Sequence, residues 1–238
     1  MGAVGHSRTF DAISLDAGGV LVVPDHGLLA WFLARAGVEV DRTRMDAAHY
    51  HGVAAVDRAR SAAETFGDYI DGYLDGLGVP AEQHEAGRRA LAAIVVPPVW
   101  RQPIPGAVAA ARRLADAGLA LAVTSNADGN VADSLARAEL AQCGPGPGVE
   151  LVWVSDSGAL GVAKPDAGIF LATAEALGLP PARVCHVGDS LHYDAEGAVA
   201  AGMPAVHIDP LGLCPAPDGH DHATSLAAFA DEVLGTSD

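Results

Sequence analysis

Polar side chains that can perform chemistry follow four short apolar runs in this chain. In chain order these positions hold Asp16, Ser125 with Asn126, Lys164, and Asp189 with Asp194. A carboxylate can attack an electrophile or hold a divalent cation, a hydroxyl can bind an anionic oxygen, and an ammonium group can neutralise negative charge. Asp or Ser at the end of a single strand is usually a helix cap. Four such positions in succession predict a shared catalytic site.

The overall charge restricts what this site can bind. The formal net charge is −16, and binding to nucleic acid or to an anionic membrane surface depends on clustered Lys and Arg. We therefore expect neither partner. A phosphorylated substrate can bind only where a local cation reverses the field. Lys164, the single lysine of the sequence, is one candidate cation, and a metal ion is another.

The elements that must position these residues alternate between strand and helix. Short, continuous apolar runs, which are typical of strands buried on both faces, cover residues 11–15, 119–124, 151–155, 183–187 and 204–208. Helical periodicity covers residues 105–117, 129–140, 166–177 and 191–201. The alternation predicts an α/β fold with a doubly wound parallel sheet. Ligands bind beyond the carboxyl ends of such strands, where the polar positions would converge.

Residues 25–102 break this alternation. They lack strand-like runs but show amphipathic helical spacing in four stretches. We predict an all-helical cap domain over residues 25–102 and an α/β core domain over residues 1–24 and 103–238. The proline-dense sequence PVWRQPIPG, residues 98–106, marks the return to the core.

The stretches LDAGGVL, VTSN, AKPDAGIF and HVGDSLHYDAEGAVAAGM resemble the four ordered motifs of the haloacid dehalogenase superfamily. The resemblance covers nearly the whole chain, and the insertion after the first motif is similar to the superfamily's type 1 cap. It implies a hydrolase with a Rossmann-like core. Asp16 would attack phosphorus and form an aspartyl-phosphate intermediate, and Ser125, followed by Asn126, would hydrogen-bond the transferring group. Lys164 would neutralise the charge on Asp16 and the phosphoryl oxygens, and Asp194 would hold Lys164 or a metal-bound water.

The metal that the resemblance implies is Mg²⁺, with Asp16, Asp189 and the backbone carbonyl of Gly18 as its protein ligands. Gly18 is also a departure, because phosphatases of the family carry a second Asp there as general acid and base. A positioned acid or base contributes roughly 100-fold to 10,000-fold to a rate. Poor leaving groups should therefore react slowly unless another residue substitutes. The candidates in or near the start of the insertion are Asp25, His26, His49 and His51.

Three alternatives to a phosphatase have to be tested for a site without that second Asp. The first alternative, a phosphonoacetaldehyde hydrolase, is excluded because those enzymes need a lysine in the cap and residues 1–163 contain none. Haloacid dehalogenases use no metal, and an unpaired Asp189 near Asp16 would raise a carboxylate pKa and weaken the nucleophile. Arginines of the insertion could still grip a substrate carboxylate, so 2-haloacid dehalogenation stays open: Arg42, Arg44, Arg58 and Arg60. The third alternative is a weakened site that binds a phospho-ligand without turnover.

Cysteine and histidine placement suggests no second site. Cys143, Cys185 and Cys214 are odd in number and widely spaced, which predicts reduced thiols and a cytoplasmic location. No apolar run has the length that spans a bilayer. His220 and His222 form a potential metal pair, but a polar turn before the C-terminal helix explains them without a metal.

Overall fold

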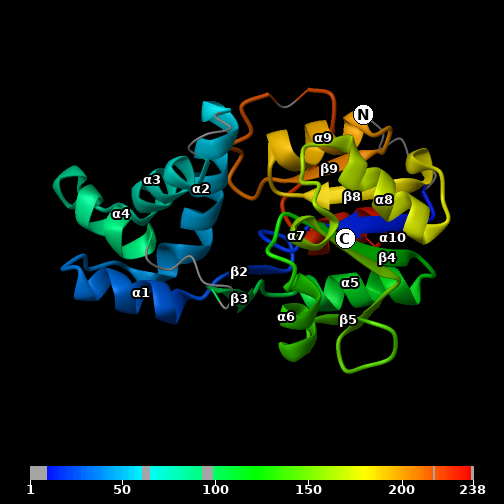
Figure 1. Ribbon diagram of the computed structural model, residues 1–238, viewed down its shortest axis with the longest axis horizontal. Coiled ribbons are helices and arrows are strands. Elements are labelled where there is room, and N and C mark those ends of the chain that lie inside the picture. The colour runs from blue at the N-terminus through cyan, green and yellow to red at the C-terminus, as the bar shows by residue number, and fades with distance from the viewer. Residues whose placement is uncertain (1–9, 61–64, 93–98, 217, 237–238) are drawn as a thin grey trace.

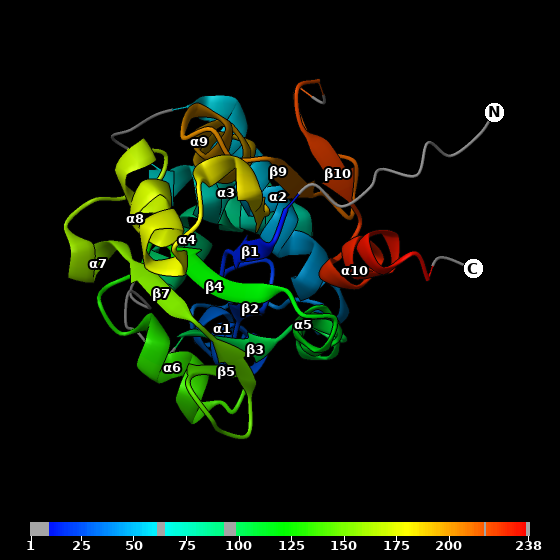
Figure 2. The same ribbon diagram turned by 90° about the vertical axis from the view of Figure 1, so that its right-hand side faces the viewer.

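A six-stranded parallel sheet forms the centre of the molecule. The computed structural model describes residues 10–60, 65–92, 99–216 and 218–236, and its strands lie in the order β10-β9-β8-β1-β4-β7 (Figures 1 and 2). All neighbouring pairs in this sheet are parallel. The strands are β1 (Ala12–Leu15), β4 (Ala120–Ser125), β7 (Trp153–Asp156), β8 (Val184–Gly188), β9 (Ala205–Ile208) and β10 (Asp221–Ala223). The predicted α/β fold with a parallel sheet is confirmed.

Helices cover both faces of this sheet, which explains why its central strands are mostly apolar on both faces. Successive residues of a strand point to opposite faces, so Ile13 and Leu15 of β1 enter one core while Ala12 enters another. The first core is completed by α5 (Ala107–Asp116), α6 (Val131–Arg137) and α10 (Leu226–Leu234). The second is completed by α8 (Ala167–Leu177) and α9 (Gly197–Ala200).

Four helices between β1 and β4 form a separate body at one end of the molecule (Figure 1). They are α1 (His26–Arg35), α2 (Met45–Ala59), α3 (Thr65–Leu77) and α4 (His84–Ala92), and we call them the helical segment. Leu33, Met45 and Leu74 are fully buried in a core of their own. A Cβ at Gly76 of α3 would lie 2.7 Å from the Ala48 Cα of α2, so glycine permits the close approach of these two helices.

The chain leaves and re-enters the α/β core through two antiparallel strands, β2 (Val22–Pro24) and β3 (Trp100–Pro103). The expectation that residues 25–102 lack strands is therefore wrong at its C-terminal end. The sequence WRQP of β3 carries no apolar run because this strand is largely exposed. Residues 1–9 of the predicted core, and 61–64 and 93–98 of the predicted cap, lie outside the described residues. The two domain boundaries stay predictions.

The remaining elements are short. A second small sheet contains β5 (Ala141–Cys143) and β6 (Val149–Leu151), so the predicted strand at 151–155 in fact spans the end of β6 and the start of β7. The predicted helix at 191–201 begins as a π-helix, η5 (Leu191–Glu196). Short helical turns are η1 (Arg42–Arg44), η2 (Ala81–Gln83), α7 (Ser157–Leu160) and η4 (Pro181–Arg183). None of the helices in the described ranges combines the length and apolar character that crossing a membrane requires.

Candidate active site

Lys164 lies between two buried carboxylates beyond the carboxyl ends of β1 and β8. Its Nζ is 3.0 Å from Asp16 Oδ2 and 2.6 Å from Asp194 Oδ1. All three residues are less than a tenth exposed. Two roles were expected for Asp194, holding Lys164 or holding a metal-bound water. In this structure its side chain contacts Lys164. The arrangement places one ammonium group so that it can neutralise Asp16 and any anion beside it.

Backbone hydrogen bonds fix the positions of Asp16 and Lys164. The Asp16 N–H donates to the Val187 carbonyl at 2.8 Å, which continues the ladder between β1 and β8. The Asn126 side chain accepts from the Lys164 N–H at 2.8 Å and donates to the Lys164 carbonyl at 3.0 Å. Asn126 therefore holds the loop that carries the lysine. Ser125 is buried at the end of β4, beside β1 in the sheet.

Burial and neighbouring charges perturb the acids and the base of this cluster. Burial raises the pKa of Asp16 to about 7, with Asp194 and Asp189 adding to the rise and Lys164 opposing it. Burial would also raise the pKa of Asp194, but Lys164 and the hydrogen bond from His186 outweigh it and hold the value well below its usual range. Burial would lower the pKa of Lys164, but Asp16 and Asp194 outweigh it and raise the value. The ion pair between Lys164 and Asp194 is also the shorter of the two that the lysine makes.

His186 of β8 forms a hydrogen bond with Asp194. The sequence analysis did not predict this contact. Its Nε2 lies 2.9 Å from Asp194 Oδ1 and its Nδ1 lies 3.0 Å from Ser14 Oγ. A carboxylate only accepts, so Nε2 carries the hydrogen and Nδ1 accepts from the Ser14 hydroxyl. Burial lowers the pKa of this histidine, which favours its neutral form. Polar residues inside apolar strands were the available signal, because a buried polar group needs a partner.

The support continues across the sheet as a chain of buried hydroxyl groups. Ser14 Oγ lies 2.7 Å from Thr124 Oγ1, which lies 2.6 Å from Thr173 Oγ1, and Thr173 donates to Ser155 Oγ at 2.8 Å. These residues come from β1, β4, α8 and β7. The network therefore links the lysine and its carboxylates to most of the width of the sheet, and it restrains their positions.

Asp189 completes a set of three carboxylates that can hold a cation. One oxygen from each of Asp16, Asp189 and Asp194 lies within 4.8 Å of the other two. Asp194 already forms hydrogen bonds with Lys164 and His186. The remaining pair, Asp16 and Asp189, offers the hard oxygen ligands that Mg²⁺ prefers. Burial, with a smaller contribution from Asp194 and Asp189, raises the pKa of Asp16, and a bound cation would favour its ionised form. The donor set therefore fits a magnesium ion.

The Gly18 carbonyl lies in the loop between these acids and β2. The isolated bridge between Gly18 and Val22 uses the Ala17 carbonyl and the Gly19 N–H, so its two hydrogen bonds leave the Gly18 oxygen unused. Gly19 has a φ of +64°, and a Cβ there would lie 1.9 Å from Asp189 Oδ2. Glycine is therefore required at position 19, both for the backbone conformation and for the approach of Asp189.

The helical segment contributes one histidine to the cluster. His49 of α2 is buried, its Nε2 lies 2.8 Å from Asp189 Oδ2, and its Nδ1 lies 2.9 Å from the Tyr69 hydroxyl. Its ring packs edge-on against Trp100, with 5.5 Å between centroids. A Cβ at Gly18 would lie 3.2 Å from that same indole. The space where the family's second Asp would project therefore borders Trp100.

The other three candidates for the missing acid are engaged elsewhere. Asp25 caps α1 through the Leu28 N–H and pairs with Arg101 at 2.8 Å. His26 faces Asp46 at 3.3 Å. The backbone and side chain of His51 pack against α3 at Gly72 and Gly76. Of the four, the structure brings only His49 into the carboxylate cluster.

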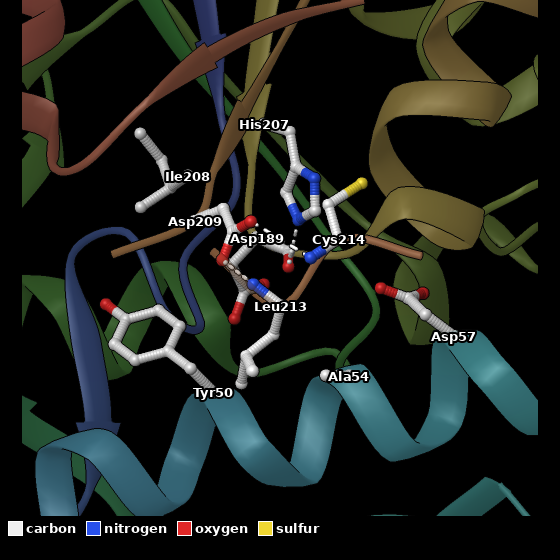
Figure 3. Close-up of a pocket in the computed structure, with 9 residues that line it drawn as sticks. All are labelled: Tyr50, Ala54, Asp57, Asp189, His207, Ile208, Asp209, Leu213 and Cys214. Atoms are coloured by element: carbon white, nitrogen blue, oxygen red, sulfur yellow. Dashed lines mark hydrogen bonds between the residues drawn. The ribbon is translucent and has the colours of Figure 1, made fainter. Parts of the chain in front are cut away.

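A second contact between the helical segment and the core involves Asp57, which the sequence analysis missed. Asp57 of α2 accepts hydrogen bonds from the Ser190 hydroxyl at 2.7 Å and from the N–H groups of Leu191 and His192 at 2.8 and 3.0 Å. It therefore caps the helix that follows Asp189, and it lines the pocket drawn in Figure 3. An acidic residue late in α2 gave no sequence signal for a partner 133 residues away.

The insertion arginines do not join the cluster. Arg60 pairs with Glu196 at 2.6 Å on the surface, and Arg42, Arg44 and Arg58 are exposed.

The sequence is similar to one protein-family model and to one characterised phosphatase. Residues 10–202 match the family model described as haloacid dehalogenase-like hydrolase. A phosphoserine phosphatase of Thermus thermophilus is 39% identical over 98 residues, which make up 41% of this chain and 36% of that protein. The match thus spans little more than a third of the relative's length.

Solved structures agree on the fold. A HAD phosphatase from Thermococcus onnurineus superposes with a TM-score of 0.56 at 18% identity, covering 96% of this chain and 99% of that one. An L-2-haloacid dehalogenase superposes with a TM-score of 0.60 at 19% identity, covering 95% and 99%. The fold is therefore common to two activities and does not choose between them. Because the family model spans most of the sequence, this chain belongs to the haloacid dehalogenase-like hydrolase family and is an enzyme.

Proposed function

We propose that the chain is a magnesium-dependent phosphatase of a phosphorylated small molecule, with Asp16 as covalent nucleophile. The observation that carries this proposal is the placement of Asp16 between Lys164 Nζ, at 3.0 Å, and Asp189 within the carboxylate cluster. A second acid beside the nucleophile is harmful without a cation, because like charges raise a pKa. A bound Mg²⁺ would supply charge neutralisation for the nucleophile and the phosphoryl oxygens.

The proposed reaction has two displacements at phosphorus. First, an Asp16 carboxylate oxygen forms a bond to phosphorus while the bond to the leaving oxygen breaks, and the leaving group takes a proton. Second, water attacks the phosphorus of the aspartyl phosphate, loses a proton, and releases inorganic phosphate and free Asp16. Lys164 holds positive charge against the phosphoryl oxygens in both steps, Asp194 keeps the ammonium in place, and Ser125 hydrogen-bonds the transferring group.

His49 is our candidate for the proton transfers that Gly18 cannot perform. It is the only one of the four candidates that contacts the carboxylate cluster, and it does so from the helical segment. The Tyr69 hydroxyl at its Nδ1 orients the ring and leaves Nε2 facing the cluster. An imidazole is suited to exchange protons near neutral pH.

Dehalogenation is a second candidate, and Gly18 favours it. In that reaction Asp16 would attack the carbon that bears the halogen, and halide would depart without needing a proton. The hydrogen bond between His49 and Asp189 provides Asp189 with a partner in the absence of a metal. Against it stands the carboxylate set that fits magnesium, which a dehalogenase does not use.

One experiment separates the two activities. The full chain is assayed on aryl phosphates, acyl phosphates, alkyl phosphates and 2-haloacids, each with magnesium and with chelator. We expect phosphate release that chelator abolishes and that Asp16→Asn lowers by at least about a thousandfold, while the exposed control Asp128→Asn keeps wild-type rates. Halide release that survives chelator, with no phosphate release, would establish dehalogenation instead. Phosphate release that survives Asp16→Asn would exclude the covalent mechanism.

A further inference from the structure

A second cluster of side chains that could hold a metal ion lies at the β10 edge of the sheet, next to Asp189. It contains His207 of β9, Cys214 in the following loop, His220, and His222 of β10. One ligand atom from each residue lies within 4.8 Å of those of the other three. The Cys214 sulfur is 3.7 Å from His220 Nε2, and the His220 and His222 ring centroids are 4.6 Å apart. The polar-turn interpretation of the last two histidines does not account for this convergence.

The fold holds these residues together by regular structure. His222 and His207 are directly opposed in the parallel pair of β10 and β9, so their side chains lie on the same face of the sheet. The Asp209 carboxylate accepts the Leu213 N–H at 2.8 Å and the Cys214 N–H at 3.0 Å. These bonds shape the loop that carries the thiol. Three of the four ligand positions are therefore set by a strand pair and a braced loop, and His220 directly precedes β10.

His207 has a buried nitrogen without a partner, and this nitrogen points to a ligand. Its Nε2 lies 2.9 Å from the Asp189 carbonyl, which can only accept, so Nε2 carries the hydrogen and Nδ1 has a free lone pair. In the described part of the chain, no group bonds to that buried Nδ1. Figure 3 shows His207 beside Cys214, with the dashed bond running from the ring to Asp189. Metal-binding histidines characteristically donate their second N–H to a carbonyl or carboxylate.

The donor types select the metal. Three imidazole nitrogens and one thiolate suit Zn²⁺, whereas magnesium prefers oxygen. A tetrahedral zinc site has ligand-to-ligand edges of about 3.3 to 3.8 Å, given the usual Zn–N and Zn–S lengths. The Cys214–His220 distance already has this value, and because every separation is within 4.8 Å, none exceeds the tetrahedral edge by more than about 1.5 Å. Four protein ligands make a closed, structural site.

We propose that His207, Cys214, His220 and His222 bind one zinc ion. The ion would fasten the loop between β9 and β10 to the sheet edge. It would also fix the ring of His207, whose Nε2–H holds the Asp189 carbonyl, so the site adjoins the proposed magnesium ligand through its backbone. This inference does not depend on the proposed function, because zinc binding is measured without any substrate.

The test is a cobalt titration of the full, untagged chain after chelator treatment, with excess magnesium present. Co²⁺ bound by a thiolate in a tetrahedral site gives a charge-transfer band and intense visible d–d bands. We expect both to saturate at one Co²⁺ per chain and to disappear when Zn²⁺ displaces the cobalt. Absence of these bands from the wild-type protein would overturn the proposal.

Variants identify the ligands. Cys214→Ser should abolish the charge-transfer band, and His222→Ala should weaken cobalt affinity at least about tenfold. His222 is exposed on an edge strand, so its replacement leaves the buried core intact, which circular dichroism verifies. Cys143→Ser and His84→Ala, which change a cysteine and a histidine outside the cluster, should bind like wild type. A charge-transfer band that persists in Cys214→Ser, or that is lost in Cys143→Ser, would contradict the assignment.

Discussion

The two halves of the active site are held in different ways. In the core half, Asp16 directly follows β1, Lys164 lies in the loop before α8, and Asp194 lies in η5. Buried ion pairs and hydrogen bonds join these three residues to the sheet. In the helical half, His49 and Asp57 of one helix, α2, reach the core through side chains alone. The charged side chains of the site are therefore held by the α/β core. Under our proposal, the residue that meets the leaving group is His49, which lies on α2 outside the sheet.

Removing the cation of the core half should have the largest effect on activity. Lys164→Ala leaves Asp16, Asp189 and Asp194 without their buried ammonium, so phosphatase turnover should fall by at least about a thousandfold. Lys164→Arg should restore little, because the planar guanidinium is bulkier than the ammonium it replaces in a site that is 4% exposed. Single-turnover rates check this. Wild-type rates in the arginine variant would show that any cation suffices.

Replacement of Asp194 should show how strongly the stability of the core half depends on pH. Asp194→Asn breaks a buried pair and should lower the free energy of unfolding by about 3 to 5 kcal/mol at pH 7. Because the pKa of Asp194 is held below its ordinary value of 3.8, the stabilisation is present above about pH 4 and is lost as the pH falls further. Denaturant titrations should therefore show the gap between wild type and variant narrowing below pH 4. A constant gap would mean that Asp194 acts through packing and not through charge.

The helical half should control the leaving group. If His49 is the acid, His49→Ala should slow alkyl phosphates by roughly 100-fold and aryl phosphates with acidic phenols much less. Tyr69→Phe should show the same trend more weakly, because it removes only the hydrogen bond at Nδ1. The matched control is His51→Ala, on the same helix but outside the cluster.

A positioning role for His49 would give a different result. If this residue only orients Asp189, both substrate classes should slow equally and the apparent magnesium affinity should fall. Equal losses on alkyl and aryl phosphates would therefore remove His49 as the proton donor.

The smallest effect should come from the contact between α2 and the segment after Asp189. Asp57→Ala removes a helix cap and should lower the free energy of unfolding by about 1 to 2 kcal/mol. Hydrogen exchange at the Leu191 and His192 amides should become faster, because both lose their acceptor. Arg60→Ala removes the exposed pair with Glu196 on the same helix end and should cost less than about 1 kcal/mol. Equal effects of the two variants would show that the buried cap has no special role.

The parallel sheet and the polar strand ends were predictable because each depends on local sequence. Continuous apolar strands and short motifs after them located Asp16, Lys164 and Asp189 without any tertiary information. His186, Asp57 and Cys214 were not found, since each acquires its partner only when distant segments meet. Cys214 and His220 also lie in a loop without periodicity, so their approach to His207 depends on the pairing of β9 with β10.

The most direct test of the covalent mechanism is detection of phosphate on Asp16. The protein is mixed with magnesium and an aryl phosphate, quenched in acid within the first turnover, and mapped by peptide mass spectrometry. Our account predicts one phosphoryl group on the peptide that contains Asp16. It should accumulate further in His49→Ala, where transfer of a proton from water is slowed, and be absent from Asp16→Asn. Turnover with no phosphorylated Asp16 at any quench time, or with phosphate on a different residue, would contradict it.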